Sequence, residues 1–227
     1  METVVISLGG SILIPGDNDH IFLREISDLI REQCGDKRIF IVCGGGKVAR
    51  YYISTARDLG RPVWELDELG IGATRLNARL LQMALGDVAV DHIPTTAKEA
   101  VEVSSKGKVV VMGGTAPGHT TDAVSAMVAE EAKASRIVNA TSVDAAYSAD
   151  PRKFKDAKRL KRITFEELHT LVNVGVHGAG PSNVFDKLGA EIAMRKRIPI
   201  YIINGRNLAE MKRAILGQEV EGTLVGE

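Results

Sequence analysis

The sequence predicts an α/β fold with a mainly parallel central sheet and helices on both of its faces. Short apolar runs recur along the chain, as at Thr3 to Leu8, Ile39 to Cys43 and Val109 to Met112. Continuous apolar runs of this length are typical of parallel strands that are buried on both faces. Amphipathic helical patterns alternate with these runs, which is how parallel sheets are built. Glycine-rich or polar loops follow four of the strands.

The composition is that of an ordinary globular protein. The chain has 227 residues, 44% of them hydrophobic and 26% charged, and its formal net charge is zero. We expect one domain over residues 1–227, and no general nucleic-acid or membrane binder, because such proteins usually carry a basic excess. The two cysteines, Cys34 and Cys43, suggest neither a disulfide framework nor a metal cluster. Without a signal peptide or a long apolar stretch, we expect a cytoplasmic protein.

The first two strand-to-loop junctions are rich in glycine. The first strand runs into Gly9-Gly10-Ser11, and the second runs into Gly44-Gly45-Gly46-Lys47 before a helix at about 48–59. Lys47 and Arg50 lie three residues apart, so both can occupy one side of the first turn of that helix, where the helix dipole disfavours cations. A bound polyanion would remove that conflict. We therefore predict a phosphate site here rather than a solvated helix face.

The segment 64–86 is predicted to be a loop followed by a helix. Asp67 and Glu68 lie near the start of that helix, where acidic residues are favoured in any case, so capping and ligand binding are equally good interpretations. We expect a short strand at 87–92 and a short helix at 96–103. One face of the longer helix is expected to consist of Leu76, Leu80, Leu81 and Ala84.

The loop after the third strand is the most informative stretch of the chain. Nine residues, GGTAPGHTT, separate Met112 from Asp122, where a helical pattern begins. An ordinary βα turn has about 2–6 residues, whereas glycines and a helix N-terminus at the end of a parallel strand suit an anion. We therefore predict a ligand loop rather than a tight turn. Within it, His119 could make a hydrogen bond inside the loop or take part in acid–base chemistry.

The second half of the chain continues the alternation of strands and helices. A helix after Asp122 leads to a strand at 136–139 and then to a long polar loop from Thr141 to Asp150. The basic segment 152–162 is expected to be a solvated face or a hairpin, and Gly175 to Pro181 a loop. The other expected elements are helices at 166–172, 183–197 and 208–216, a strand at 199–203 and an edge strand at 221–225.

Four strands thus end in polar loops, at Gly9–Ser11, Gly44–Lys47, Gly113–Thr121 and Thr141–Asp150. Right-handed crossovers put the carboxyl ends of parallel strands on one edge, so these loops should face a common crevice. Two phosphorylated ligands facing each other would explain three glycine-rich cradles. Phosphoryl transfer between them needs positioning and charge neutralisation more than a covalent nucleophile. Neither the GxxxxGK[ST] nor the GxGxxG pattern is present.

These motifs resemble those of the amino acid kinase family, and within it the archaeal type of uridylate (UMP) kinase. The matching strings are GGS, GGGKVAR, GGTAPGHTTDA and DAAYSADP, in this order through essentially the whole chain. The resemblance implies a three-layer αβα sandwich and ATP-dependent phosphorylation of UMP to UDP with magnesium. It also implies a homo-oligomer, commonly a hexamer, with an acceptor side in about 1–121 and an ATP side in about 122–227.

The resemblance also assigns roles to individual residues. Asp122 matches an acid that organises cations around the transferring phosphoryl group, and Lys47 and Arg50 are candidate catalytic cations. Magnesium is expected on the phosphates, without a dedicated cluster of protein ligands. The ATP side would comprise Ser7, Gly9, Gly10, Ser11, Gly46, Arg50, Thr141, Ser142, Tyr147 and Asp150. The UMP side would comprise Gly45, Asp67, Thr115, Ala116, Pro117, Gly118, His119, Thr120 and Thr121.

Several positions depart from the family pattern. Ser7 stands where many members carry lysine, and Glu191 stands where a late-helix lysine is common, with Lys187 one turn upstream. Ser142 and Ala145 replace the usual Asn and Gly of the ATP loop. Two alternatives to a UMP kinase therefore stay open, namely a related kinase of a small phosphate or carboxylate and a non-catalytic nucleotide- or oxyanion-binding protein. The second loop has no histidine, which argues against an isopentenyl phosphate kinase.

Overall fold

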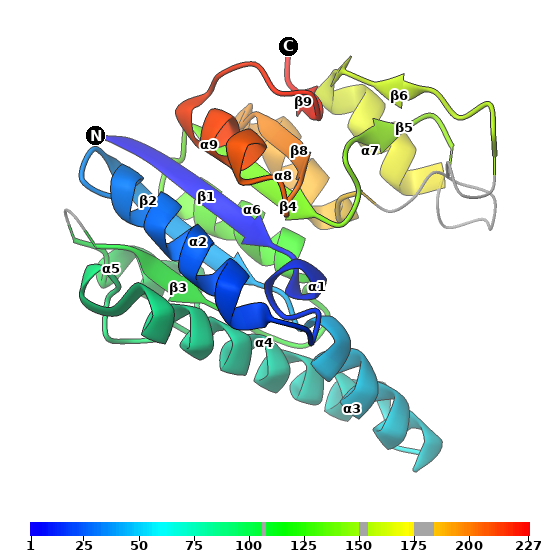
Figure 1. Ribbon diagram of the computed structural model, residues 1–227. Helices are drawn as coiled ribbons and strands as arrows, with labels where there is room; N and C mark the ends of the chain where they lie inside the picture. Colours follow the sequence, from blue (N-terminus) through cyan, green and yellow to red (C-terminus); the bar gives the residue numbers. More distant parts are fainter. Residues whose placement is uncertain (106–107, 150–153, 175–183) are drawn as a thin grey trace.

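A seven-stranded sheet with the order β3-β2-β1-β4-β8-β9-β7 forms the centre of the molecule (Figure 1). The computed structural model describes residues 1–105, 108–149, 154–174 and 184–227. The pairs from β3 to β8 are parallel, β9 is antiparallel to β8, and β5 and β6 form a separate two-stranded sheet. The strands are β1 Glu2–Leu8, β2 Lys37–Cys43, β3 Val110–Met112, β4 Arg136–Thr141, β5 Ala146–Tyr147, β6 Arg159–Leu160, β7 Arg162–Ile163, β8 Ile200–Asn204 and β9 Thr223–Val225.

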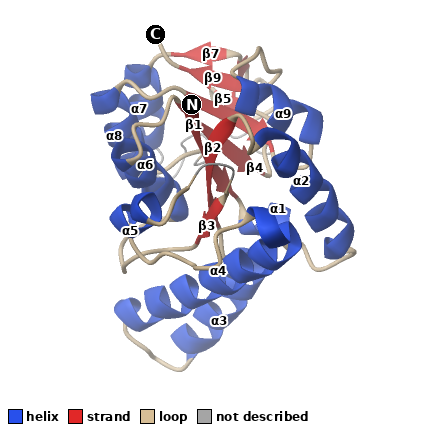
Figure 2. Ribbon diagram, turned by 90° about the vertical axis from the view of Figure 1, so that its left-hand side faces the viewer, coloured by secondary structure: helices blue, strands red, loops and turns tan. Residues whose placement is uncertain are grey.

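Helices cover both faces of the sheet, so the molecule has the three layers that were predicted (Figure 2). One face packs against α1, α2, α4 and α9 through a core that includes Ile6, Ile41 and Leu81. The other face packs against α5 to α8 through a core that includes Phe40 and Val110. α3 packs along α4. The helices are α1 Gly10–Leu13, α2 Asp19–Gln33, α3 Gly46–Asp58, α4 Val63–Leu85, the 3-10 helix η1 Gly86–Val88, α5 Ala97–Glu102, α6 Thr121–Glu131, α7 Phe165–Val174, α8 Lys187–Lys196 and α9 Leu208–Leu216.

Strand β1 explains why the apolar runs are continuous rather than alternating. Successive strand residues point to opposite faces, and in β1 Val4 and Ile6 enter one core while Val5 enters the other. All three side chains are fully buried. Burying an aliphatic side chain of this size contributes about 1.5–3 kcal/mol, so the central strands hold the two helical layers together.

Polar side chains define where four of the helices begin. Thr96, Thr120, Asp186 and Asn207 are the N-cap residues of α5, α6, α8 and α9, and each side chain accepts a hydrogen bond from the backbone N–H three residues on. Such caps satisfy donors that have no partner inside the helix. For α6 this confirms the helix start that was predicted at the end of the central loop.

The structure also corrects some of the expected elements. The segment 87–92 is not a strand; η1 occupies its start, and of its described residues Ala89 alone forms a bridge, to Val109. α4 begins at Val63, earlier than expected, and Leu76 and Leu80 of its predicted face are exposed. β9 is not an edge strand, because β7 pairs with its outer side. Predictions for 150–153 and for Gly175 to Pro181 lie outside the described residues.

Candidate functional site

Four loops meet at one edge of the sheet. Because β1 is parallel to its neighbours, Leu8 lies beside Cys43 on one side and beside Ala140 on the other. Met112 in β3 lies beside Val42. The loops that follow β1, β2, β3 and β4 therefore leave the sheet in the same direction, as the sequence predicted. This edge is the carboxyl end of the parallel strands, where open α/β sheets bind ligands.

The first two glycine segments, the loop after β1 and the loop after β2, are in direct backbone contact. Both run into a helix sooner than predicted, because α1 begins at Gly10 and α3 at Gly46. A Cβ atom on Gly10 would lie 2.2 Å from the nitrogen of Gly46 and 2.4 Å from the carbonyl oxygen of Gly44. Gly46 has φ of +61°, and a Cβ atom there would lie 2.6 Å from the Gly10 carbonyl. Glycine is required on both sides, because any side chain would push the loops apart. The loop after β1 and the first turn of α3 thus form one continuous surface.

A cavity of about 170 Å³ lies beside this contact. Asp67 of α4 lies on one side of it, and its Oδ2 accepts a hydrogen bond from the backbone N–H of Gly118 at 2.9 Å. Thr115, Pro117 and Gly118 belong to the same loop but do not line the cavity. Of the predicted UMP-side residues, the structure brings six together around it, namely Gly45, Asp67, Ala116, His119, Thr120 and Thr121.

Asp122 is a second acidic residue at this edge, in addition to Asp67. It lies in the first turn of α6, and Ser7 Oγ donates a hydrogen bond to its Oδ1 at 2.7 Å. Burial raises the pKa of the Asp122 carboxyl from 3.8 to about 6; the Ser7 hydrogen bond lowers this pKa, and the nearby charge of Asp186 raises it. The carboxyl is therefore mostly ionised at neutral pH and is suited to attract cations. The Ser7 hydroxyl is engaged with this carboxyl.

The predicted ATP-side residues fall into two groups. Gly9 and Thr141 are neighbours, since Gly9 N–H donates to the carbonyl of Ala140 at 2.9 Å at the end of β4. Ser142 is exposed just beyond them. Tyr147 lies in β5, and its phenol donates to the carboxylate of Asp144 at 3.0 Å. Burial, together with this hydrogen bond, raises the pKa of Tyr147. Asp150 lies outside the described residues.

Lys47 lies in the first turn of α3 and Arg50 at the start of its second turn, because the helix begins at Gly46, earlier than predicted. Both side chains are exposed, and neither forms an ion pair or a hydrogen bond with the residues that the structure describes. Because Gly46 rests on Gly10, this turn begins at the contact between the first two loops. Two cations therefore stand beside the glycine surface without an acidic partner in the described part of the chain.

Sequence reasoning missed the contribution of the middle of α4. Thr74, Arg75 and Asn77 all form hydrogen bonds with the loops that follow β2 and β3. Thr74 and Asn77 are buried together with Leu81, and the three residues recur at helical spacing. The buried face of α4 could have been predicted from this spacing if buried positions had been allowed to be polar as well as apolar.

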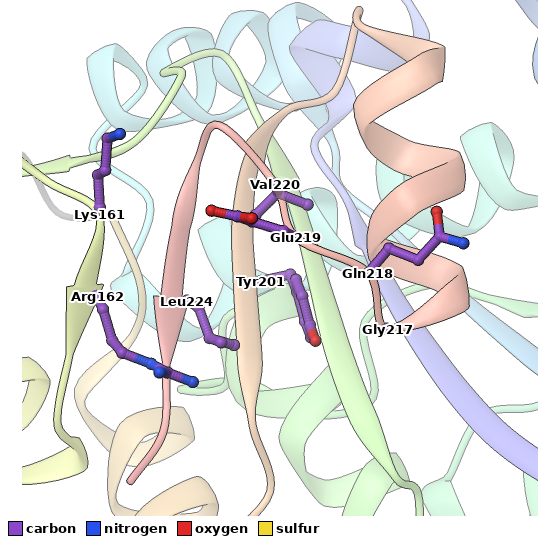
Figure 3. A pocket seen from close by; sticks show the side chains of 8 residues that line it. All are labelled: Lys161, Arg162, Tyr201, Gly217, Gln218, Glu219, Val220 and Leu224. Carbon is purple, nitrogen blue, oxygen red and sulfur yellow. The ribbon is translucent and has the colours of Figure 1, made fainter.

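A larger cavity of about 450 Å³ lies at the opposite edge of the sheet (Figure 3). It is lined by Lys161, Tyr201, Gly217 and Glu219, among others. Gly217 packs against the guanidinium of Arg136, the first residue of β4, so this cavity opens at the amino end of that strand. It is therefore separate from the edge where the four loops meet.

The described residues contain no cluster of three or more His, Cys, Asp or Glu side chains able to hold a metal ion. None of the described helices combines the length and the apolar character needed to cross a membrane.

Comparison with known proteins agrees with this geometry. The profile of the amino acid kinase family matches residues 2–204. The chain is 44% identical to the uridylate kinase of Methanoculleus marisnigri over 100% of this chain and 97% of that protein. It is 41% identical to the uridylate kinase of Methanobrevibacter smithii over 98% of each chain. The crystal structure of uridylate kinase from Archaeoglobus fulgidus superposes with a TM-score of 0.88 at 42% identity, covering 100% of both chains.

A UMP kinase from Bacillus anthracis shares the fold with a TM-score of 0.78, at 23% identity and with 99% of this chain covered. The family profile and the relatives described above all align with the strands β1 to β4 and with the loops that follow them. The predicted resemblance is thereby confirmed. The chain belongs to the amino acid kinase family.

Proposed function

We propose that this protein is a UMP kinase, which transfers the γ-phosphoryl group of ATP to UMP in a cytoplasmic step of pyrimidine nucleotide synthesis. One observation carries the proposal. The loop after β1 and the loop after β2 touch backbone to backbone, and the cavity formed by the central loop and Asp67 lies beside that contact. Two phosphate cradles in contact bring a donor and an acceptor phosphate head to head, as in-line transfer requires.

The acceptor side of the proposed site belongs to residues 1–121. UMP would lie in the cavity, with its phosphate near Gly45 and its ribose hydroxyls near Asp67. Oδ2 of Asp67 accepts from the Gly118 N–H, and Oδ1 has no hydrogen-bond partner among the described residues, so Oδ1 suits a ribose diol. The uracil and the phosphate would contact the loop Thr115, Ala116, Pro117, Gly118, His119, Thr120 and Thr121.

The donor side would combine the loop after β1 with residues 122–227. The ATP phosphates would rest on Gly9, Gly10, Ser11 and Gly46, because the three glycines have no side chain to keep a phosphate away from the backbone. The adenine and ribose would contact Thr141, Ser142, Tyr147 and Asp150. Because Ser7 Oγ is engaged with Asp122, its part in ATP binding would be to hold that acid in place.

Charge neutralisation is the main chemical task of the site. Lys47 and Arg50 would contact the transferring phosphates from the N-terminal end of α3, where they lack acidic partners in the described part of the chain. Asp122 fits a phosphate-bound magnesium ion, because its carboxylate is a hard oxygen ligand and is mostly ionised at neutral pH. Magnesium bound to ATP would supply neutralisation of the β- and γ-phosphates.

An assay of nucleoside diphosphate formation with alternative acceptors tests the proposal. ATP hydrolysis and product formation are measured with UMP, CMP, isopentenyl phosphate and acetylglutamate. We expect turnover with UMP well above the other acceptors. Turnover with another acceptor and none with UMP would replace the proposal with a related kinase of this fold. ATP binding without turnover of any acceptor would favour the non-catalytic nucleotide-binding alternative.

We also propose that the protein forms a homo-oligomer, with a hexamer as the expected form. α4 exposes an apolar stripe, Leu69, Leu76, Leu80 and Met83, whose members recur at helical spacing. Two of these side chains, Leu76 and Met83, are more than 60% exposed. Apolar patches of this kind mark sites of protein association. A second copy of this chain would cover the stripe.

A further inference from the structure

The middle of α4 carries two buried polar side chains that reach two different loops of the site. Asn77 is 4% exposed, and its Nδ2 donates to the carbonyl oxygen of Gly44 at 2.8 Å. Thr74 is 7% exposed, and its Oγ1 accepts from the backbone N–H of Gly114 at 2.7 Å. Residues three apart lie on neighbouring positions of a helix face. One turn of α4 therefore holds the loop after β2 and the loop after β3 at once.

Each of these two hydrogen bonds is accompanied by a second bond that occupies another polar group of the same residue. The Thr74 hydroxyl donates its own proton to the carbonyl of Ile71 at 2.6 Å, so the lone pairs of Oγ1 remain for Gly114. Gly44 N–H is already used in a bond to Leu8 O at 2.9 Å, which leaves its carbonyl to face Asn77. Each of these two loops thus presents a backbone group that bonds to a buried side chain of α4.

The loop backbones lie directly on the helix at these points. A Cβ atom on Gly113 would lie 2.6 Å from Thr74 Oγ1 and 2.7 Å from Arg75 N. Arg75 adds hydrogen bonds from its guanidinium to the carbonyls of Gly114 and Thr115, at 3.1 and 3.2 Å. The cavity beside Asp67 is bounded by the same turn of α4, since Thr74 lines it.

We propose that Thr74 and Asn77 are positioning residues for the acceptor, which act by setting the separation between the loop after β2 and the loop after β3. This inference rests on the proposed function. The acceptor phosphate and the pyrimidine nucleoside would contact different loops, and α4 holds those loops at one spacing. The ATP phosphates would rest mainly on the loop after β1, which α4 does not hold through these two side chains.

The expected signature is therefore a change confined to the acceptor. Loss of either hydrogen bond should raise KM for UMP and lower kcat, because misplacement of a substrate by a fraction of an ångström is costly in in-line chemistry. KM for ATP should stay within about twofold of the wild-type value. If Thr74 and Asn77 had only a structural role, the variants would have a lower melting temperature, but KM for UMP would not change more than KM for ATP.

Thr74→Val and Thr74→Ser form the first test. Valine keeps the shape of threonine but removes the oxygen, which leaves the buried N–H of Gly114 without an acceptor. We expect an increase of about tenfold or more in KM for UMP. Serine keeps the hydroxyl and should restore KM for UMP to within about threefold of wild type. Equal kinetics in the valine variant and the wild type would overturn the assignment of Thr74.

Asn77→Asp adds a readout that depends on pH. A buried ionised carboxylate would face the Gly44 carbonyl without a proton to share, whereas a protonated carboxyl could donate as asparagine does. Burial raises the pKa of such a group, so the ratio of variant to wild-type kcat/KM for UMP should rise as the pH falls from about 8 to about 5.5. A ratio that is constant over this range would overturn the assignment of Asn77.

Gln82 provides the matched control. It lies on the same helix, is 5% exposed, and donates its side-chain amide to the carbonyl of Val90, which is not part of the four loops. Gln82→Leu should change stability and leave both KM values unchanged. If wild-type protein shows no UMP phosphorylation, the proposed function fails. If wild type is active and the Thr74 and Asn77 variants match Gln82→Leu, this inference alone fails.

Discussion

Replacing Asp122 by asparagine should stabilise the protein without ligands at neutral pH, although it removes the acid proposed for catalysis. Burial raises the pKa of the Asp122 carboxyl from 3.8 to about 6, so at pH 8 the folded state confines a charge that its surroundings disfavour. The difference of roughly two pKa units corresponds to about 3 kcal/mol, at about 1.36 kcal/mol per unit. Because Asp122 is partly accessible to solvent, we expect screening to reduce the measured gain to about 1–2 kcal/mol.

The sign of the effect follows from proton binding. Between about pH 4 and pH 6 the folded state holds a proton on Asp122 that the unfolded state has already released, so this group stabilises the wild-type fold as the pH falls. That contribution is present below pH 4 and is lost as the pH rises through 6. Asparagine does not titrate. The difference in the free energy of unfolding between the variant and the wild type should therefore be largest near pH 8 and shrink toward pH 4.

Urea denaturation followed by circular dichroism at several pH values measures this difference, with unchanged m-values as the check that unfolding remains comparable. Asp87→Asn is a useful control, because the guanidinium of Arg31 lowers the pKa of Asp87 and the pH dependence should have the opposite sign. An Asp122→Asn protein that is no more stable than wild type at pH 8, or whose advantage does not change with pH, would refute the reasoning.

Three further predictions concern the loops and the surface. Arg50→Ala should lower turnover at least tenfold, which corresponds to about 1.4 kcal/mol of transition-state stabilisation; near-normal kinetics would show that another cation fills the role. Gly10→Ala should abolish turnover and lower the melting temperature, because its Cβ would collide with the backbone of the loop after β2. Gly35→Ala is the control, since Gly35 has open space around it and the change should leave both melting temperature and activity unchanged. An active Gly10→Ala enzyme would contradict the loop contact. Leu76→Glu combined with Leu80→Glu should dissociate the proposed oligomer in sedimentation velocity at unchanged secondary structure, and an assembly of unchanged size would exclude this stripe from the interface.

The strands and their loops were predictable because burial on both faces leaves a direct trace in the sequence. β1 and β2 are apolar at successive positions, since odd and even residues enter different cores. The alternation of strands with helices implies that the strands are parallel. Parallel strands place the four loops at one edge of the sheet, so this could be predicted before any contact between them was known. The short strands β6 and β7 were not predictable, because two residues such as Arg162 and Ile163 are too few to establish a period.

α4 shows where such reasoning stops. Its hydrophobic pattern placed Leu76, Leu80 and Leu81 on one face, but Leu76 and Leu80 are exposed while Leu81 is buried. Thr74 and Asn77 are buried as well. A helix that packs on a sheet alone buries its apolar stripe. α4 has further partners, because the loops after β2 and β3 present backbone groups that only polar side chains can satisfy. The buried face of α4 therefore combines apolar side chains such as Leu81 and Leu85 with Thr74 and Asn77, because this one face packs on the sheet and also holds the two loops.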